Sequence, residues 1–473
     1  MTRTIRIDPV TRIEGHAKVF LELDEDGEIA SAGLVVNELR GFERILVGMA
    51  AEQMPLVTAR ICGVCPTAHH LAATDALEHA AGVTPPPAAK LLRELMYMGH
   101  LIHSHTLSLF VLQGPDLIMG LDADPAVRNI VGVVQANPDA AKKALRCRSL
   151  GQKINELVGG RGTHPVTSVA GGITFELDDS RHKMLSGWAD ETLALLSELV
   201  PLAKGLLLQQ IELHPALMAD WIVPAWSLGT VKDGRISMLD GPLRAVDEAG
   251  NTRLEFPAEA YDGHLEESVI EWSYMKQVHI KDGDRHHEYR VGPMARINVG
   301  GTYGTPLADA ELATLRELGG QPCHAVVLQT YSRLIELLYA AERAQEILRD
   351  PALGGPTRVP VQFTGGRGVG HVEAPRGTLI HDYEIDDQGL VRSANLIVAT
   401  QQNYASINRV IAQAAASHVL GKADDAALLN AVEFGIRCFD PCLSCATHAL
   451  GEMPMEIAIT RDTQVVRRIT RAD

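Results

Sequence analysis

The chain has 473 residues, enough for one large core or two to three domains, and 46% hydrophobic with 22% charged residues is ordinary globular composition. Its 43 basic and 59 acidic residues give a net charge of −16, which argues against nucleic-acid binding because such proteins normally carry a basic surface. Only 4% of the residues are aromatic, so packed helices are favoured over an aromatic-rich β-sandwich.

Targeting signals are not apparent in the sequence. No run of eighteen or more apolar residues occurs, so we expect no membrane span. The first residues, MTRTIRIDPV, lack the charged region and apolar run of a secretory signal. A cytoplasmic location is therefore expected.

The predicted elements begin with strands and continue mainly as helices. Alternation at 5–7 and 18–23, a turn at 24–27 and a returning strand at 29–36 predict a small N-terminal sheet. Apolar residues at helical spacing then predict long helices, the second kinked or split at Pro201. These helices are expected at 88–112, 180–213, 307–318, 325–349 and 403–420.

Two further regions complete the predicted fold. Residues 225–300 are rich in Asp, Gly and Glu and predict turns and short strands in a peripheral lobe, while the glycines at 365–368 indicate a connector. We therefore expect an α+β fold, mainly α. It would have a central bundle of long helices, a small N-terminal β-sheet and the strand-containing lobe.

Four of the seven cysteines form two C-x-x-C pairs, Cys62/Cys65 and Cys442/Cys445. Two intervening residues let both sulfurs of a pair turn toward one ion, and four thiolates suit a soft metal. Spacing alone leaves structural zinc, an iron–sulfur cluster and a redox-active metal open. Cys147, Cys323 and Cys438 are expected to be ordinary buried thiols.

Two observations weigh against zinc. Residues 66–441 separate the pairs, whereas zinc ribbons usually close within about 15–20 residues. The charges beside the pairs, Arg60 and Asp440, look buried, and a structural zinc knuckle does not need them.

Five segments together resemble the large subunit of nickel-iron hydrogenases, in that family's order and over nearly the whole chain. They are Asp8–His16 (DPVTRIEGH), Arg40–Glu43 (RGFE), Arg60–Cys65 (RICGVC), Glu373–Gly377 (EAPRG) and Asp440–His448 (DPCLSCATH). The resemblance implies an enzyme that interconverts H₂ with protons and electrons by heterolytic cleavage. Residues 271–276 and 440–451 look like those of soluble, NAD-linked bidirectional members.

The resemblance also implies a ligand set. Cys62 and Cys442 would be terminal nickel ligands, while Cys65 and Cys445 would bridge nickel to an iron that carries one carbon monoxide and two cyanides. A magnesium ion, or iron in its place, would be held by Glu43, His448 and the backbone carbonyl of Leu396, since oxygen ligands suit a hard cation.

Other matched residues would surround the metals. Glu14 would move protons near a terminal cysteine; read without the resemblance, it would only pair with Arg12. Arg376 would hold a positive field over the site, with Pro375 and Asp440 beside it. The resemblance also implies that the Thr400 hydroxyl hydrogen-bonds a cyanide. It implies as well that the His69 side chain points at the sulfur of a bridging cysteine. Ser104 departs from membrane-bound members, which have an aspartate there, and this removes one carboxylate.

The chain extends 25 residues beyond His448, and alternation at 455–460 predicts a strand. In the family this tail is removed after nickel insertion, so 1–448 would be one mature domain and 449–473 a processed extension. The partners implied are H₂, an iron–sulfur small subunit, flavin- and NAD-binding diaphorase subunits, a maturation endopeptidase and nickel-insertion proteins. No cysteines remain for an iron–sulfur cluster in this chain.

Two other kinds of protein compete with this interpretation. A complex I subunit of the same ancestry lost the four cysteines, so their retention argues against that relative. A zinc-stabilised structural or assembly protein could use the same thiols. Metal content discriminates, because such a protein would hold zinc without nickel and show no carbonyl or cyanide vibrations.

Overall fold

The N-terminal sheet forms as the alternation predicts. The computed structural model describes residues 3–26, 28–419, 425–447, 456–461 and 464–470. Strands β1 (Arg3–Ile7), β2 (Lys18–Leu23) and β3 (Ile29–Val35) pair antiparallel in that order. The apolar side of β2 is buried, and the sheet packs on α15 (Tyr404–Val419), where Asn408 Oδ1 accepts from Leu34 N at 2.9 Å.

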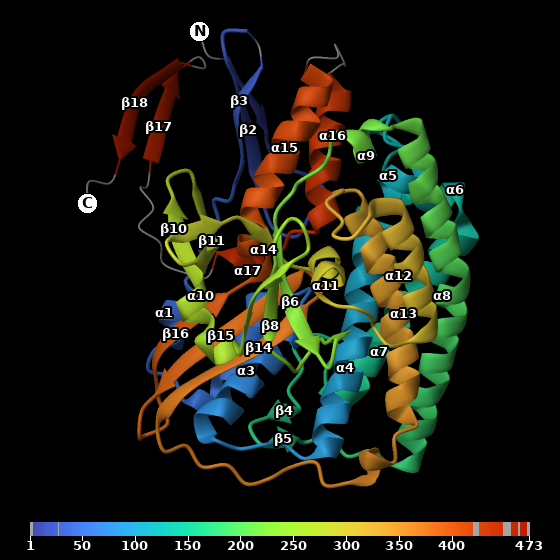
Figure 1. Cartoon of the computed structure of the whole chain (residues 1–473), viewed down its shortest axis with the longest axis vertical. Helices are drawn as coiled ribbons and strands as arrows, with labels where there is room; N and C mark the ends of the chain where they lie inside the picture. The colour runs from blue at the N-terminus through green and yellow to red at the C-terminus, as the bar shows by residue number, and fades with distance from the viewer. Residues whose placement is uncertain (1–2, 27, 420–424, 448–455, 462–463, 471–473) are drawn as a thin grey trace.

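Long helices lie side by side through the body of the molecule (Figure 1). They are α4 (Pro87–Thr106), α7 (Pro138–Gly159), α8 (Asp179–Leu213), α12 (Pro306–Gly319) and α13 (Leu328–Leu348). Helices α4 and α7 approach closely at Gly99 and Gly151. A Cβ on Gly99 would stand 2.8 Å from Gly151 O, so a larger residue would not fit there. The predicted bundle of long helices is confirmed, although α7 was not predicted, and the mainly α, α+β fold is confirmed as well.

Pro201 does not split its helix. Of the expected kink or split, the split is wrong, because helix α8 runs through Pro201 without a break. The buried stripe continues from Leu196 and Val200 on one side to Ala203 and Leu207 on the other. Packing against α7 and α13 supports the helix where the proline ring removes a backbone hydrogen bond.

Residues 225–300 contain the expected short strands. β6 pairs with β13, β8 and β7, β8 also pairs with β9, and β10 to β12 form a separate antiparallel sheet. The region ends in helix α11 (Pro293–Val299). The strands are β6 (Trp226–Lys232), β7 (Arg235–Ile236), β8 (Leu243–Val246), β9 (Thr252–Phe256), β10 (Leu265–Ile270), β11 (Ser273–Asp282), β12 (Arg285–His287) and β13 (Tyr289–Arg290).

Another sheet, packed on helix α3 (Pro66–Ala81), was not expected. It consists of antiparallel β14 (Gly366–Ala374), β15 (Gly377–Ile385) and β16 (Val391–Ile397). The glycines interpreted as a connector lie in β14 from Gly366 onward. They permit close packing, since a Cβ on Gly368 would stand 2.0 Å from Ala76 O.

The C-terminal part brings the second cysteine pair back to the start of the chain. It contains α14 (Ala399–Gln402), α15, α16 (Asp425–Phe439) and α17 (Leu443–Ala446). The expected tail strand is confirmed as β17 (Glu456–Arg461), which pairs with β18 (Gln464–Thr470) in a hairpin (Figure 1). Among the described residues, no helix combines the length and apolar character that a membrane crossing requires.

The remaining elements are short and connect the larger ones. Helix α4 continues into a π-helical turn, Leu107–Leu112, within the helix predicted at 88–112. The others are α1 (Phe42–Leu46), α2 (Met54–Thr58), α5 (Gly114–Met119), α6 (Ile130–Ala136), α9 (Ala216–Ala219), α10 (Tyr261–His264), β4 (Ser168–Val169) and β5 (Gly172–Ile173).

Candidate metal centre

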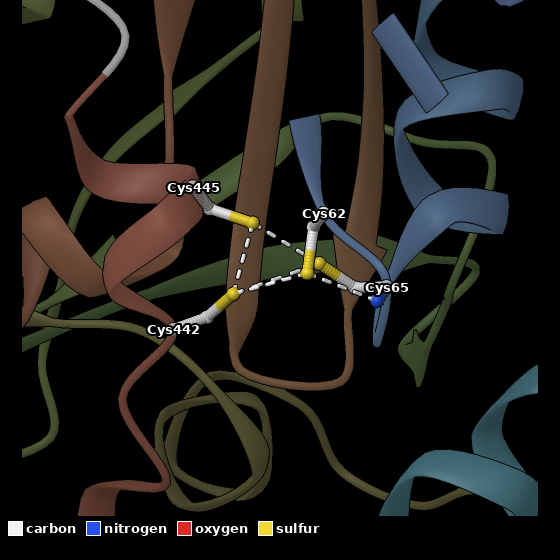
Figure 2. Close-up of side chains that lie close together, drawn as sticks. All are labelled: Cys62, Cys65, Cys442 and Cys445. Atoms are coloured by element: carbon white, nitrogen blue, oxygen red, sulfur yellow. Dashed lines mark hydrogen bonds between the residues drawn. The ribbon is translucent and has the colours of Figure 1, made fainter. Parts of the chain in front are cut away.

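The four paired cysteines converge from opposite ends of the chain (Figure 2). Cys62 follows a short 3-10 turn, and Cys65 stands immediately before α3. Cys442 stands immediately before α17, and Cys445 lies within it. Each pair is therefore fixed at the start of a helix, and both pairs are buried.

The sulfur atoms are close enough to share one metal centre. Cys62 Sγ lies 3.3 Å from Cys442 Sγ, and Cys65 Sγ lies 3.1 Å from Cys445 Sγ. All four ligand atoms fall within 4.8 Å of one another. Among the described residues, this is the one such group of three or more His, Cys, Asp or Glu side chains.

The pKa values of the four thiols are consistent with a site that binds a cation. Hydrogen bonds from the other three cysteines, Cys442 first, lower the pKa of Cys62 well below its usual value. Burial raises the pKa of Cys442 and of Cys445 well above it. The buried group does not favour four thiolates unaided, so a bound cation is needed to hold all four deprotonated. Four soft sulfur donors fit nickel and iron, and they fit zinc as well.

Arg376 covers the cysteines from the turn between β14 and β15. Its Nε donates to Asp440 O at 2.6 Å and its Nη2 to Asp440 Oδ1 at 3.1 Å. Burial alone would lower the pKa of Arg376, but Asp440 and the nearby thiols raise it well above its usual value. Pro375 and Arg376 line a cavity of about 20 Å³ that adjoins Cys65, Cys442 and Cys445. The site therefore has a fixed positive charge on one wall.

His69, on α3, reaches the second pair. Its Nε2 lies 3.3 Å from Cys445 Sγ and its Nδ1 lies 3.0 Å from His381 Nε2. His381 Nδ1 in turn lies 2.6 Å from the Tyr383 hydroxyl. Sequence analysis missed His381 and Tyr383, because both belong to the unexpected strand β15.

The direction of these hydrogen bonds follows from the state of the sulfur. A Cys445 thiolate can only accept, so His69 Nε2 must donate to it. His69 Nδ1 then accepts from His381 Nε2, and His381 Nδ1 accepts from Tyr383. Burial raises the pKa of Tyr383 well above its usual value, so the phenol keeps the proton that it donates.

Glu14 meets the second pair directly. Its backbone forms a parallel bridge with Cys442, and its carbonyl accepts from Leu443 N at 3.2 Å. The carboxylate accepts from Ser444 N at 3.1 Å and from Ser444 Oγ at 2.5 Å. The interpretation that Glu14 only pairs with Arg12 is wrong, because Arg12 is paired with Asp116 instead.

Thr400 supports the same segment from α14. Its hydroxyl oxygen accepts from Cys442 N at 2.9 Å, and the residue is buried. A hydroxyl that accepts one hydrogen bond still has its own proton to donate.

The residues expected at a second metal site are partly brought together. Glu43 Oε1 accepts from the backbone N of Leu396 at 2.8 Å. His448 lies outside the described residues. Ser104 is buried on α4, its hydroxyl has no hydrogen-bond partner among the described residues, and it does not line the cavity beside the cysteines.

One expectation about charges beside the cysteines is wrong. Asp440 is buried, as expected, but the Arg60 side chain is exposed. Arg60 is adjacent to buried Ile61 in a short turn, and its own side chain is directed outward. Arg60 therefore gives no argument against a zinc site. The charge argument against a zinc site now rests on Asp440 and on Arg376, which donates a hydrogen bond to Asp440.

Comparison with known proteins identifies the family. The model of the nickel-dependent hydrogenases matches residues 40–143 and 250–448, and a HoxL-like model matches residues 4–39. The chain belongs to the nickel-dependent hydrogenase family. This chain is therefore the catalytic large subunit of a nickel-iron hydrogenase, and its four converging cysteines are positioned to bind a metal.

Individual relatives agree with the family. The chain is 42% identical to a component of the F420-non-reducing hydrogenase vhu of Methanococcus voltae, over 87% of this chain and 98% of that protein. It is 38% identical to the beta component of the NAD-reducing hydrogenase HoxS of Cupriavidus necator, over 97% of each. A solved NAD⁺-reducing [NiFe]-hydrogenase in the H₂-reduced state matches with a TM-score of 0.89 and 38% identity, covering 94% of this chain and 99% of that one.

Proposed function

We propose that this hydrogenase subunit oxidises H₂ reversibly and passes the electrons to an iron–sulfur small subunit. From there they would go to NAD(P) or another soluble acceptor, through flavin- and NAD-binding diaphorase subunits, in the cytoplasm. Two similar proteins that carry NAD reduction in their names support this coupling. The observation that carries the activity is the buried group of four cysteine sulfurs beneath Arg376.

The nickel-iron group, when bound, supplies the site at which H₂ is split heterolytically. Cys62 and Cys442 would be terminal ligands of nickel, and Cys65 and Cys445 would bridge nickel and iron. Arg376 Nη1 is buried without a hydrogen-bond partner among the described residues, so it has a donor to offer a cyanide nitrogen. Thr400 has its hydroxyl proton for a second one. These donors support an iron with one carbon monoxide and two cyanides.

Glu14 would carry the proton away. Its carboxylate is held on Ser444, between the cysteines of the second pair, and its backbone is bridged to Cys442. A base must stand within hydrogen-bond reach of the group it serves, or one water away. Ser444 binds both carboxylate oxygens of Glu14, which supports the proposal that this carboxylate takes up the proton.

A magnesium or iron ion would lie at Glu43 and Leu396. The hydrogen bond that joins them supports this, because it sets a carboxylate oxygen beside the Leu396 peptide. His448 would complete the set. The mature chain would be residues 1–448, one domain with the 225–300 lobe at its periphery, and a maturation endopeptidase would remove 449–473 after nickel-insertion proteins load the site.

Infrared spectroscopy of the purified chain with its co-purifying partner tests the proposal. One carbonyl and two cyanide bands are expected, absent from a Cys65→Ser variant and retained in Cys147→Ser, whose thiol is also buried but does not belong to the group. A nickel-replete, tail-cleaved sample without such bands would overturn the proposal and return the four cysteines to structural zinc.

A further inference from the structure

Asp116, on α5, is a fully buried carboxylate outside the metal centre. It receives both terminal nitrogens of Arg12, at 2.9 and 2.6 Å, in the two-pronged geometry that fixes a guanidinium most firmly. It also accepts from Arg437 Nη1 at 3.1 Å, and Arg128 Nε lies 3.6 Å from it. Three arginines therefore share this one carboxylate.

Arg437 links the Asp116 carboxylate to Thr11, the residue before Arg12 in the N-terminal segment. Its Nε donates to Thr11 O and its Nη2 to Thr11 Oγ1, both at 3.2 Å. The same guanidinium binds Glu433, whose carboxylate accepts from Thr11 N at 2.7 Å. The backbone and side chain of Thr11 are thus held on α16, the helix that ends just before Cys442.

Arg12 is held in a conformation that its own backbone disfavours. Its φ is +55°, in the left-handed region that residues other than glycine rarely adopt. Such a conformation persists where surrounding contacts over-determine it. Here those contacts are Asp116 and the carbonyl of Leu112, which accepts from Arg12 at 2.8 Å.

Two residues further on, the chain reaches Glu14 and its bonds to Ser444. The segment between Thr11 and Glu14 is therefore anchored at one end by Asp116 and Glu433 and at the other by the second cysteine pair. Loss of the first anchor would let Glu14 shift, and a shift of about 1 Å at a reacting group can cost about 100-fold in rate.

We propose that Asp116 is a positioning residue for proton transfer, holding Glu14 against the Cys442–Cys445 segment through Arg12 and Arg437. This inference rests on the proposed role of Glu14 as the proton carrier. Within the described part of the chain, the side-chain hydrogen bonds that Asp116 accepts come from these arginines and not from the cysteines, so its influence on the second pair passes through the arginines.

The test uses Asp116→Asn in the complete, nickel-loaded complex. Asparagine keeps the shape of the side chain but loses the charge that the three guanidinium groups share. The expected result is about a 10- to 100-fold lower H₂-oxidation rate, with a larger solvent deuterium isotope effect and unchanged nickel content and infrared bands. Glu191→Gln removes a carboxylate with the same bidentate hold on an arginine, Arg146, at the surface, and is expected to change none of these quantities.

A double-variant comparison separates positioning from general damage. If Asp116 acts through Glu14, Asp116→Asn slows the enzyme little further once Glu14→Gln is present. Equal slowing in both backgrounds, or slowing without a change in isotope effect, would overturn the proposal. Should Asp116→Asn fail to load nickel, Arg12→Lys, which keeps the charge but loses the two-pronged bond, decides by the same criteria. Full activity of Glu14→Gln would instead refute the proposed role of Glu14.

Discussion

The two cysteine pairs have the same spacing but are held in different ways. In the first pair, the support is local, since Val64 N and Cys65 N both point at Cys62 Sγ, at 3.2 and 3.3 Å. In the second pair, it comes from distant parts of the chain. Thr400, Glu14 and His69 each bond to residues 442–445 across 42 to 430 positions of sequence.

The difference shows what a short motif can specify. Beyond its own turn and the start of α3, the first pair has Arg40 bound to the carbonyl of Ile61 beside it. The second pair is complete only when the N-terminal segment, α3 and α14 have packed around it. Acidity does not follow the pairs, because the pKa of Cys62 is lowered while the pKa values of Cys65, Cys442 and Cys445 are raised. Both pairs therefore depend on a bound metal to become fully thiolate.

Removing a ligand from either pair has the largest expected effect. Cys445→Ser and Cys65→Ser are each expected to lower the nickel content at least about tenfold and to abolish H₂ oxidation, because both pairs serve one centre. Nickel and iron quantification on the purified complex measures this. Cys323→Ser, a buried thiol outside the group, is the control, and retained nickel in Cys445→Ser would show that the pairs act separately.

Weakening the link between Arg376 and Asp440 has the next largest effect. Arg376→Lys keeps a positive charge but cannot bind the Asp440 carbonyl and carboxylate together. We expect nickel content to be kept and the H₂-oxidation rate to fall about 10- to 100-fold, because a fixed charge over the site is lost. An unchanged rate would mean that Arg376 serves only to close the second pair.

Disrupting the hydrogen-bonded series of His69, His381 and Tyr383 has a smaller effect on the H₂-oxidation rate. Tyr383→Phe removes the proton donor at its far end, so His381 Nδ1 no longer has to accept and the direction toward Cys445 is no longer fixed. The expected result is a fall in rate of up to about tenfold with normal nickel content. His69→Ala should lower the rate further, and equal rates for Tyr383→Phe and the unaltered chain would show that the direction is set elsewhere.

Removing the Thr400 hydroxyl, a distant support of the second pair, has the smallest effect on the H₂-oxidation rate. Its effect on the free energy of unfolding is measurable. Thr400→Val leaves Cys442 N buried without its acceptor, which costs about 1–3 kcal/mol in the free energy of unfolding. Thermal or denaturant unfolding measures the loss. Thr74→Val is the matched control, because the Thr74 hydroxyl donates to His70 O within α3. A similar loss of stability in Thr74→Val would show that the bond from Cys442 to Thr400 contributes no more than an ordinary buried threonine.

The sequence predicted the features that are periodic or contiguous. Helices α4, α8, α12, α13 and α15 follow from their apolar spacing, whereas α7 was not predicted. The cysteines, Arg376, Asp440, Thr400 and His69 follow from the resemblance of short segments to the family. Helix α3 escaped because it is buried on nearly all sides and so has no distinct apolar stripe. Sheet β14–β16 escaped because the glycines at 365–368 look like a connector, although Gly368 permits α3 to pack closely.

The parts that could not be predicted depend on tertiary contact. His381, Tyr383 and Asp116 belong to no matched segment, and their meaning appears only once β15, α5 and α16 are in place. The pairing of Glu14 was also misjudged without the family resemblance, because the neighbouring Arg12 offers an obvious partner in sequence. Packing instead gives Arg12 to Asp116, which leaves the Glu14 carboxylate for Ser444.

Nickel X-ray absorption spectroscopy of the complete complex tests most directly whether both pairs hold one nickel-iron centre. A nickel coordination shell dominated by sulfur is predicted for the unaltered chain, with fewer sulfur neighbours in both Cys62→Ser and Cys442→Ser, one variant from each pair. A shell of nitrogen and oxygen donors, or a change in only one of the two variants, would contradict it.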